Sequence, residues 1–528
     1  MKEFDQGLRR TENEMVQNKC TPTLYEAREF AKAGYEVIPV YRTILADLET
    51  PVSAFLKFSE SGSPFILESV EGGEDVARFS YVGVNYRRAL VFPTSGGQID
   101  QYPSGEKKLS DEGKMVDPMK VIKSLMPPDG SVAPVSGMPG FGGGFVGYEG
   151  SECYSRREST VPTHPDTLGI PDAIFFETGE LMVFDRKSPT IKILTNIRVE
   201  GKPEEIDTMY SDASSRIEDA VLQLRKPLDP KYSNSKKPKV LSNEIKSNFS
   251  PLEYEEAVKG VKEHLSAGDA FQVVLSQRLA RQTNAEGITI YRYLRSTNPS
   301  PYTFLMDFTG LLDDPQKIFQ VIGASPELVI DVAGKKLVHH PLAGTRLRGE
   351  DEGEDKALEV ELLADPKDRA EHVMLVDLER NDLGRVAKYG SVKVTDLMSV
   401  VRFSRVMHMV STVEAELADG KTCFEAITAC NPVGTVSGAP KVEAMKIINK
   451  FEPTRRGIYS GGVGYISYCG DAKIAIAIRT LVKLGKEVIN QAGGGIVMDS
   501  DPASERQETL NKASAGFRAV ELAEKHEL

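Results

Sequence analysis

The segment GDAKIAIAIRTLV, residues 470–482, alternates strictly between two kinds of side chain. Its three isoleucines fall on one face, while Ala475, Ala477 and Arg479 fall on the other, because successive side chains of a strand point to opposite sides. The pattern predicts one β-strand. A guanidinium between small residues is suited to bidentate binding of a carboxylate, although a strand-end arginine in solvent is an equally simple explanation.

The glycine triplet Gly493, Gly494 and Gly495 lies in NQAGGGIVMDS, residues 490–500, after the next expected strand. Successive glycines can expose backbone N–H groups that together bind an anion, although a tight turn also uses glycines. The segment leads directly into ASERQETLNK, residues 503–512.

Two acidic pairs share the spacing i, i+3, which on a helix places both carboxylates on one face. They are Asp368 with Glu371 in DPKDRAEH, and Glu505 with Glu508 in ASERQETLNK. A proline precedes each pair, as at the beginning of a helix. First-turn acids that stabilise the helix N-terminus are the simpler alternative.

Four carboxylates from two helices would suit a hard cation, and their oxygen atoms favour Mg²⁺ over zinc. The nearest histidine, His372, is one position off the acidic face. Lys512 continues the face of Glu505 and Glu508 at i+7, so that a cation and two carboxylates point the same way.

His408 lies in RFSRVMHMVSTVEAE, residues 402–416, whose alternation predicts a strand with His408 on the face of Ser404, Val406 and Thr412. A lone histidine in a strand is usually structural. Its ordinary pKa of about 6.5 also makes it a candidate acid or base.

Composition indicates a soluble globular protein of 528 residues that binds small molecules and proteins. Its 65 basic and 77 acidic residues give a net charge of −12, which argues against binding nucleic acid or an anionic membrane. Its five cysteines include no CxxC pair, so we expect a reducing compartment. The charged N-terminus resembles no targeting signal, and the apolar runs are too short to span a membrane, so the expected location is the cytoplasm.

The chain is expected to have an α+β fold in two main parts, residues 35–200 and 251–520. Short strands are predicted at ALVFP, FFETGELMVFD and TIKILTNIRV in the first part. Between the two parts, residues 201–250 are predicted to form a linker or exposed excursion that includes a helical stretch. Whether the two parts share sheets is left open by the sequence.

Ordered motifs along most of the chain resemble the chorismate-utilising enzymes, and specifically the anthranilate synthase component I family. The motifs are ILESVEGG, NPSPYTFLMDF, GASPELVI, HPLAGTRLRG, DRAEHVMLVDLERNDLGRV, VMHMVS, NPVGTVSGAPK, YSGGVGY, QAGGGIVMDS and NKASA. The resemblance implies two large antiparallel sheets packed together, with the active site in a cleft between them.

The resemblance also implies roles for individual residues. Glu371 and Glu508 would bind Mg²⁺, with Asp368 and Glu505 nearby or bound through water. Glu327 would be the general acid, and His408 would assist proton removal or pyruvate loss. The residues that would contact chorismate are Gly344, Thr345, Thr435, Tyr459, Arg479, Gly493, Gly494, Gly495 and Lys512, with Thr435 beside the catalytic groups.

The implied reaction is amination of chorismate at ring carbon 2 with loss of the 4-hydroxyl, followed by elimination of pyruvate to give anthranilate. Ala343 stands where aminodeoxychorismate-forming relatives carry a nucleophilic lysine. Gln272 stands where isochorismate and salicylate synthases carry the lysine that activates water. Ammonia is therefore the expected nucleophile.

The ammonia is expected to come from another chain. A glutamine amidotransferase needs a nucleophilic cysteine in a glycine-flanked turn together with a histidine, and none of the five cysteines has that setting. The resemblance implies a glutamine amidotransferase partner, component II, and hence a hetero-oligomer.

The resemblance further implies an inhibitory site for L-tryptophan. Its candidate contacts are Glu68, Ser69, Asn298, Pro301, Tyr302 and Thr303. Thr303 departs from the family, which usually has methionine there, so the strength of inhibition is open, and ILES could instead be a plain buried strand. Two other functions stay open: an aminodeoxychorismate synthase component I and a non-catalytic regulatory subunit.

Overall fold

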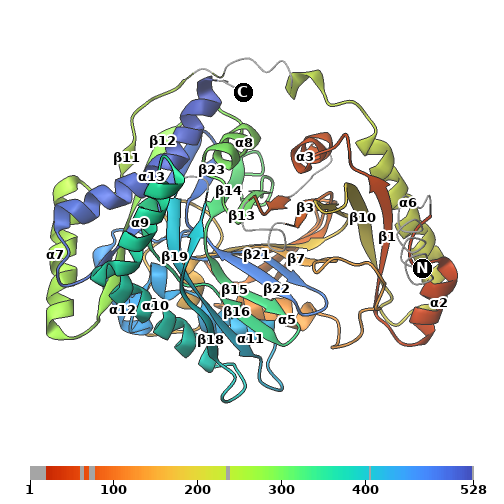
Figure 1. The fold of residues 1–528 in the computed structure, drawn as a ribbon. Helices are drawn as coiled ribbons and strands as arrows, with labels where there is room; N and C mark the ends of the chain where they lie inside the picture. The colour runs from red at the N-terminus through yellow and green to blue at the C-terminus, as the bar shows by residue number, and fades with distance from the viewer. Residues whose placement is uncertain are drawn as a thin grey trace.

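The computed structural model describes residues 19–59, 65–70, 78–232, 238, 240–403 and 406–525. Ser404, predicted to share a face with His408, lies outside these residues, as do parts of the predicted linker and of the ILESVEGG motif. Strands form the middle of the molecule, and helices lie at its outer flanks (Figure 1).

Two twelve-stranded sheets dominate the described part of the chain. In sheet A the strands run in the order β1 (Val37–Leu45), β10 (Thr190–Arg198), β9 (Leu181–Asp185), β3 (Phe79–Gly83), β2 (Phe65–Glu68), β13 (Tyr302–Asp307), β14 (Phe319–Ser325), β23 (Thr480–Leu484), β24 (Glu487–Ile496), β12 (Gln272–Gln282) and β11 (Lys246–Ser247), with β20 (Gly438–Ala439) beside β12.

Sheet B has its own order of strands. They are β17 (Leu342–Leu347), β19 (Val406–Glu416), β16 (Lys336–His339), β15 (Leu328–Ala333), β22 (Ala472–Ile476), β21 (Gly462–Ser467), β7 (Gly144–Glu149), β8 (Ala173–Thr178), β4 (Tyr86–Phe92), β5 (Gln98–Gln101) and β6 (Lys107–Ser110), with β18 (Lys393–Arg402) beside β19. The pairs of named strands are antiparallel, for example β2 with β13 and β21 with β7. This confirms the predicted fold class.

Eleven α-helices among the described residues cover the sheets. They are α2 (Leu24–Lys32), α3 (Pro51–Phe58), α5 (Pro118–Leu125), α6 (Ile206–Leu224), α7 (Pro251–Ala267), α8 (Gly287–Thr297), α9 (Glu352–Ala364), α10 (Pro366–Gly384), α11 (Cys423–Cys430), α12 (Lys441–Phe451) and α13 (Pro502–Lys525). Short 3₁₀ turns follow the same order: η2 (Ser151–Tyr154), η3 (Pro203–Glu205), η4 (Pro230–Tyr232) and η5 (Gly434–Val436). In Figure 1, α2 and α6 lie on one flank, and α7, α12 and α13 lie on the other.

Both sheets contain strands from before residue 201 and from after residue 250. In sheet A, Glu68 of β2 is paired with Thr303 of β13. In sheet B, Gly147 of β7 is paired with Gly464 of β21. The change of composition at 201–250 therefore separates two stretches of sequence that share their sheets.

The first half of residues 201–250 contains the predicted helical stretch, which packs against sheet A and is not an exposed excursion. Helix α6 occupies Ile206–Leu224 and contacts β10 and β1. Its residues Ala213, Ile217, Ala220 and Val221 are buried because they recur at helical spacing on one face. That burial anchors the helix to sheet A.

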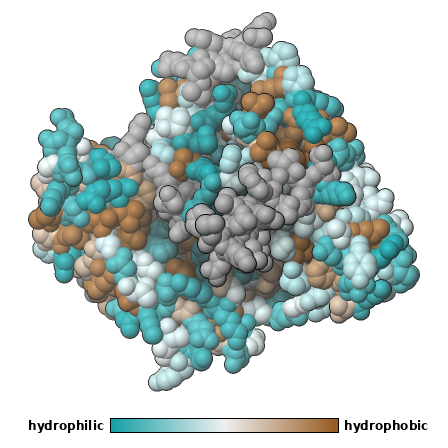
Figure 2. Space-filling view, turned by 45° about the vertical axis from the view of Figure 1, so that its right-hand side comes forward, coloured by the Kyte–Doolittle hydropathy of each residue, from teal (hydrophilic) through white to brown (hydrophobic). Residues whose placement is uncertain are grey.

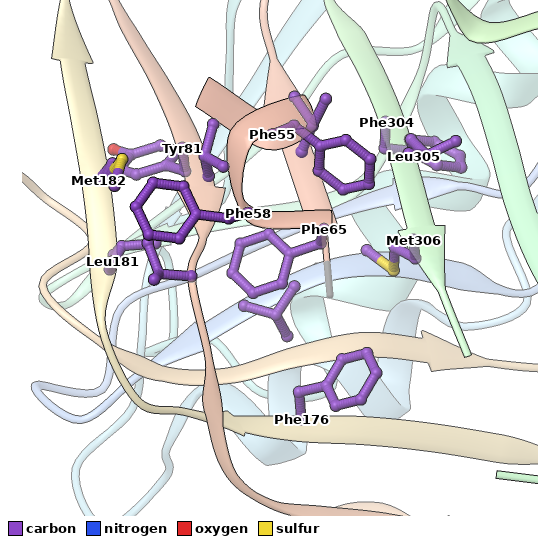
Figure 3. Close-up of a cluster of buried hydrophobic side chains, with 14 of the residues drawn as sticks. Phe55, Phe58, Phe65, Tyr81, Phe176, Leu181, Met182, Phe304, Leu305 and Met306 are labelled. Carbon is purple, nitrogen blue, oxygen red and sulfur yellow. The ribbon is translucent and has the colours of Figure 1, made fainter. Parts of the chain in front are cut away.

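An apolar core fills the space between the sheets. Figure 3 shows Phe65 of β2 and Phe176 of β8 in the same interior, one from each sheet. Phe55 and Phe58 of α3 pack around the same strand, so β2 lies between a helix and the other sheet. Burial of such aromatic side chains is the main force that holds the two layers together.

No helix of the described residues is long and apolar enough to cross a membrane. On the face shown in Figure 2, hydrophilic and hydrophobic residues are interspersed.

Candidate active site

The two helices that carry the acidic pairs begin at the prolines, as the sequence predicted. Helix α10 begins at Pro366, and its N-cap Asp365 accepts hydrogen bonds from the backbone N–H groups of Lys367 (2.9 Å) and Asp368 (3.0 Å). Helix α13 begins at Pro502. Asp501 accepts a hydrogen bond from the backbone N–H of Ser504 at 2.9 Å. These contacts satisfy first-turn donors of both helices, so the carboxylates of the acidic pairs are available to other partners.

Among the described residues, three of the four acids have a hydrogen-bond or ion-pair partner. Asp368 accepts a hydrogen bond from Arg346 at 3.0 Å. Glu505 is buried and accepts one from the Ser500 hydroxyl at 2.6 Å. Glu508 forms an ion pair with Lys512 at 2.7 Å. Each acid is thus balanced by a cation or a hydroxyl.

The fourth acid, Glu371, is electrostatically linked to both helices. Burial raises its pKa, the positive charge of Lys512 lowers it, and the negative charges of Asp368 and Glu508 raise it again. Burial likewise raises the pKa of Glu505, against the hydrogen bond from Ser500. The acids of α10 and α13 therefore lie close enough to act on one another.

These acids do not form a ready-made metal site. Within the described ranges, no group of three His, Cys, Asp or Glu side chains is arranged to hold a metal ion. The donors nevertheless fit Mg²⁺ in kind, since all four are carboxylates and Glu371 is half-buried beside like charges that a cation would neutralise. His372 does not take part, because it is fully buried and bonded to Ser411 at 2.6 Å.

The glycine triplet lies inside strand β24, so the prediction that it follows the strand is wrong, while its contact with chorismate stays a prediction. Gly493, Gly494 and Gly495 belong to β24 and pair with β12. Their missing side chains instead make room for neighbours: an added Cβ would lie 2.6 Å from Tyr459 Oη, 2.8 Å from Glu505 Oε2 and 2.2 Å from Gln272 Nε2, respectively. The three glycines therefore leave room for the side chains of Tyr459, Glu505 and Gln272 to lie against β24.

The segment 470–482 also differs from one continuous strand. It forms β22 in sheet B and β23 in sheet A, and the chain crosses between the sheets at residues 477–479. Arg479 has a φ of +50°, a left-handed conformation that costs free energy in a residue with a Cβ and that often marks functional sites. Its Nη1 donates to the backbone oxygen of Lys512 at 3.0 Å.

His408 lies on β19, whose alternating burial confirms the predicted strand. Its Nδ1 is 3.1 Å from the carbonyl oxygen of Gly344 and 3.0 Å from the Thr345 hydroxyl. A carbonyl can only accept, so Nδ1 carries the proton and Nε2 is free to accept one. Burial lowers the pKa of His408, and the nearby Arg479 lowers it further, against the Gly344 carbonyl.

Glu327 lies in the turn between β14 and β15 and is buried. Burial and, to a lesser extent, the negative charge of Glu379 raise its pKa to about 8, against the opposite effects of Thr435, His339 and Lys512. The group therefore holds a proton at neutral pH. The Thr435 side chain lies beside it, in η5.

Tyr459 and Lys512 complete the set of predicted contacts. Burial raises the pKa of Tyr459 to about 12, so its phenol stays a neutral donor. Lys512 Nζ donates to the carbonyl oxygen of Gly493 at 3.1 Å. Gly344 has a φ of +64° and lies against Asp368, because an added Cβ would be 3.2 Å from the Asp368 carboxyl carbon.

A second site is a cavity of about 300 Å³ between the sheets, lined by side chains of both. Five of the six residues predicted to bind tryptophan line it, namely Glu68, Ser69, Pro301, Tyr302 and Thr303. Asn298 instead ends α8. Tyr81 and Phe304 supply apolar wall, and Lys473, paired with Asp331 at 2.9 Å, supplies charge.

Sequence reasoning missed three supporting groups. Arg346 holds Asp368, and its position in HPLAGTRLRG next to the predicted site was an available signal. Tyr291 and Arg295 hold the buried Glu68 carboxylate at 2.5 and 3.1 Å. Their i, i+4 spacing on α8 was recognisable, but their acidic partner lies more than 220 residues earlier.

Comparison with known proteins places this arrangement in a family. A model of chorismate binding enzymes matches residues 101–518. The chain belongs to the chorismate binding enzyme family.

Its relatives define the comparison more closely. Anthranilate synthase component 1 of Pseudomonas putida is 40% identical over 502 residues, which are 94% of this chain and 98% of that protein. The protein of the same name from Acetivibrio thermocellus is 41% identical, over 95% of this chain and 99% of its own. The crystal structure of anthranilate synthase component I from Streptococcus pneumoniae TIGR4 superposes with a TM-score of 0.73 at 34% identity, covering 90% of this chain and 99% of that one. The resemblance predicted from the motifs is confirmed.

The raised pKa of Glu327 predicts a pH-dependent stability. The folded chain keeps this proton up to about pH 8, whereas an unfolded glutamate ionises near pH 4.3, so the buried acid lowers stability increasingly as pH rises between these values. Glu327→Gln should therefore raise the melting temperature at pH 8 and change it little at pH 4.5.

The control is Glu521→Gln on the exposed surface of α13, which should show no such pH dependence. An equal effect of Glu327→Gln at both pH values would contradict the assignment of a protonated Glu327.

Proposed function

We propose that this chain is the component I of an anthranilate synthase, a lyase that converts chorismate and ammonia into anthranilate and pyruvate at the first committed step of tryptophan synthesis. The observation that carries the proposal is the convergence of a neutral His408, a protonated Glu327 and the cations Arg479 and Lys512 beside the acids of α10 and α13. Proteins of that name match nearly the whole chain at about 40% identity.

Chorismate carries two carboxylates and therefore needs several donors. Arg479 presents a rigid guanidinium, Lys512 a mobile ammonium, and Tyr459 a neutral hydroxyl. Glu371 and Glu508 would hold Mg²⁺, with Asp368 and Glu505 beside them. When bound, this ion supplies positive charge to the ring carboxylate of the substrate.

Glu327 serves the first step. Ammonia forms a bond to ring carbon 2, the ring double bonds shift, and the bond from carbon 4 to its hydroxyl breaks. The departing oxygen takes the proton of Glu327 and leaves as water, which turns Glu327 into a carboxylate. Thr435 orients the acid from η5.

His408 serves the second step. Nε2 removes the proton from ring carbon 2, and the electron pair forms the aromatic ring while the bond to the pyruvate oxygen breaks. The enolpyruvyl group leaves as pyruvate after it takes up a proton. The hydrogen bond from Nδ1 to Gly344 fixes the tautomer that this step requires.

Two side chains, Gln272 and Ala343, support ammonia as the nucleophile because neither can activate water or attack the ring itself. Gln272 lies against Gly495 and offers an amide that cannot activate water. Ala343 offers no amine that could attack the ring. Ammonia would be delivered by a glutamine amidotransferase subunit in a hetero-oligomer.

The cavity between the sheets suits an amino acid with a large apolar side chain, and L-tryptophan is the proposed inhibitor. Aromatic walls from Tyr81 and Phe304 fit an indole, and Glu68 and Ser69 offer polar contacts to the amino acid backbone. Inhibition requires that tryptophan bind a less active conformation more tightly than the active one.

The proposed activity has a direct test. The purified chain with chorismate, Mg²⁺ and ammonium salts should form fluorescent anthranilate and equimolar pyruvate, and glutamine should replace ammonium only when the partner subunit is added. Accumulation of aminodeoxychorismate without pyruvate would favour the rival enzyme, and no turnover of chorismate would favour a non-catalytic subunit.

Anthranilate formation should require the Mg²⁺ that the acids of α10 and α13 are proposed to bind. A chelator should abolish anthranilate formation, and Glu508→Gln should lower kcat by about 100-fold or more, since loss of the ion removes several kcal/mol of charge stabilisation. The matched control Glu521→Gln, farther along α13, should retain activity. Full activity of Glu508→Gln would refute this metal site.

The tryptophan cavity makes a separate prediction. Ser69→Phe would fill part of the cavity, so the tryptophan concentration that inhibits should rise by about tenfold or more, because overpacking costs about 1–3 kcal/mol. Turnover without tryptophan should change little. Ser69→Ala, which leaves the space open, is the control; unchanged inhibition of Ser69→Phe would disprove the effector site.

A further inference from the structure

Arg456 is a buried arginine that has no role in the steps proposed above. It lies in the segment between α12 and β21 and is 4% exposed. A guanidinium has five N–H donors, and burying it is costly unless those donors find acceptors. Five hydrogen bonds are present: from Nε to Glu452 Oε2 at 2.9 Å, from Nη1 to the Val436 carbonyl at 2.6 Å and to Ser460 Oγ at 3.4 Å, and from Nη2 to the Val274 carbonyl and Glu452 Oε1, both at 2.6 Å. Together they fix the guanidinium in one orientation.

Glu452 is the counter-ion of Arg456 and is itself 3% exposed. Both of its carboxylate oxygens accept from Arg456, which is the bidentate geometry of a strong arginine–carboxylate pair. Oε1 also accepts from the backbone N–H and the hydroxyl of Ser276 at 2.8 and 2.7 Å. The Ser276 hydroxyl in turn accepts from Gln491 at 2.8 Å. The ion pair is therefore attached to β12 and to β24, the strand that contains the glycine triplet.

The same guanidinium lies against the ring of Tyr459, a proposed substrate contact. The Cζ atom of Arg456 is 5.4 Å from the ring centroid, within the range of a cation–π interaction. The next residue, Ser460, has a φ of +65°, a left-handed conformation that persists only where the surrounding contacts hold it. Arg456 donates to the Ser460 hydroxyl, which donates to Ser151 Oγ at 3.1 Å. Arg456 thus holds both the ring of Tyr459 and the strained turn beside it.

Arg456 also holds η5, the short turn that carries Thr435. A single 3₁₀ turn has few internal hydrogen bonds, so its position depends on contacts with other segments. The Val436 carbonyl accepts from Arg456, and the Ser437 carbonyl, just after η5, accepts from the backbone N–H of Val274 on β12 at 2.9 Å. One side chain therefore bonds to η5, to β12 and to the turn at Tyr459.

The neighbouring arginine has a different set of contacts. Arg455 pairs with the buried Asp172, and its side chain is 11% exposed. Among the described residues, the side chain of Arg455 bonds to neither η5 nor Tyr459. Two adjacent arginines thus both have buried acidic partners, but Arg456 is the one of the two that contacts both segments.

We propose that Arg456 is a positioning residue that holds η5 and the turn at Tyr459 in a fixed relation, so that Thr435 and Tyr459 can contact chorismate together. The inference rests on the proposed function, in which both of these side chains contact the substrate. A purely structural ion pair would stabilise the fold without changing the affinity for chorismate.

The first test is Arg456→Lys, which keeps the positive charge but replaces the planar fork by an ammonium group with three donors. At least two of the five acceptors then lose their partner, and η5 and the turn at Tyr459 are no longer held by one rigid group. The Kd for chorismate, measured by calorimetry with Mg²⁺ and without ammonia, should rise by about tenfold or more, because donors to a charged ligand are displaced. The KM for chorismate should rise with it.

Arg455→Lys is the matched control, since it changes the adjacent arginine of another buried ion pair. It should lower the melting temperature and leave the Kd and KM for chorismate unchanged. If Arg456→Lys does not fold, the double variant Glu452→Gln/Arg456→Met removes both charges of the pair and keeps a side-chain carbonyl for Ser276. It should show the same rise in Kd. An unchanged Kd in the variant that folds would overturn the proposal.

Hydrogen exchange separates this inference from the proposed function. Measured without substrate, the backbone N–H groups of residues 434–437 and 458–461 should exchange about tenfold faster or more in Arg456→Lys, and at the original rate in Arg455→Lys. If the original chain did not bind chorismate, the proposed function would fail, while these rates would still decide whether Arg456 holds the two segments. Unchanged exchange in Arg456→Lys would refute the positioning role.

Discussion

Lys512 is the positive charge on which the arrangement of the candidate site depends. It contacts Glu508 at 2.7 Å and the Gly493 carbonyl at 3.1 Å, and its charge also acts on Glu327, Glu371 and Glu505. Acids from two helices repel one another, and a cation among them offsets that repulsion. The proposed Mg²⁺ and the dianionic chorismate would then enter as a pair, with little change in the total charge of the site.

The crossing of the chain between the sheets brings Arg479 against the helix that carries Lys512. Residues 477–479 leave sheet B and enter sheet A, and the left-handed backbone at Arg479 turns the guanidinium toward α13. The register of β13 and β14 pairs Tyr302, which lines the cavity with Glu68, with Ser325, two residues before Glu327, so the cavity and the Glu327 turn lie at the same end of these strands.

Helix α10 carries two pairs of acidic residues that differ in their burial. Its outer acids, Asp368 and Glu371, are partly exposed and suited to a metal ion. Its inner acids, Glu379 and Asp382, are sealed from water and paired with His339 and Lys441. Carboxylates two turns apart on the same face thus differ in their partners because the protein around them differs in its access to water.

Sequence alone determined the features that depend on local spacing. The strand of His408, the helix starts at Pro366 and Pro502, and the two-sheet class follow from periodicity, proline placement and motif resemblance. Tertiary structure alone decided that 470–482 splits between the two sheets, that the glycine triplet lies within β24, and that Glu379 is paired with His339. These features depend on contacts between residues far apart in the chain, and spacing within a segment carries no information about which distant segment will pack against it.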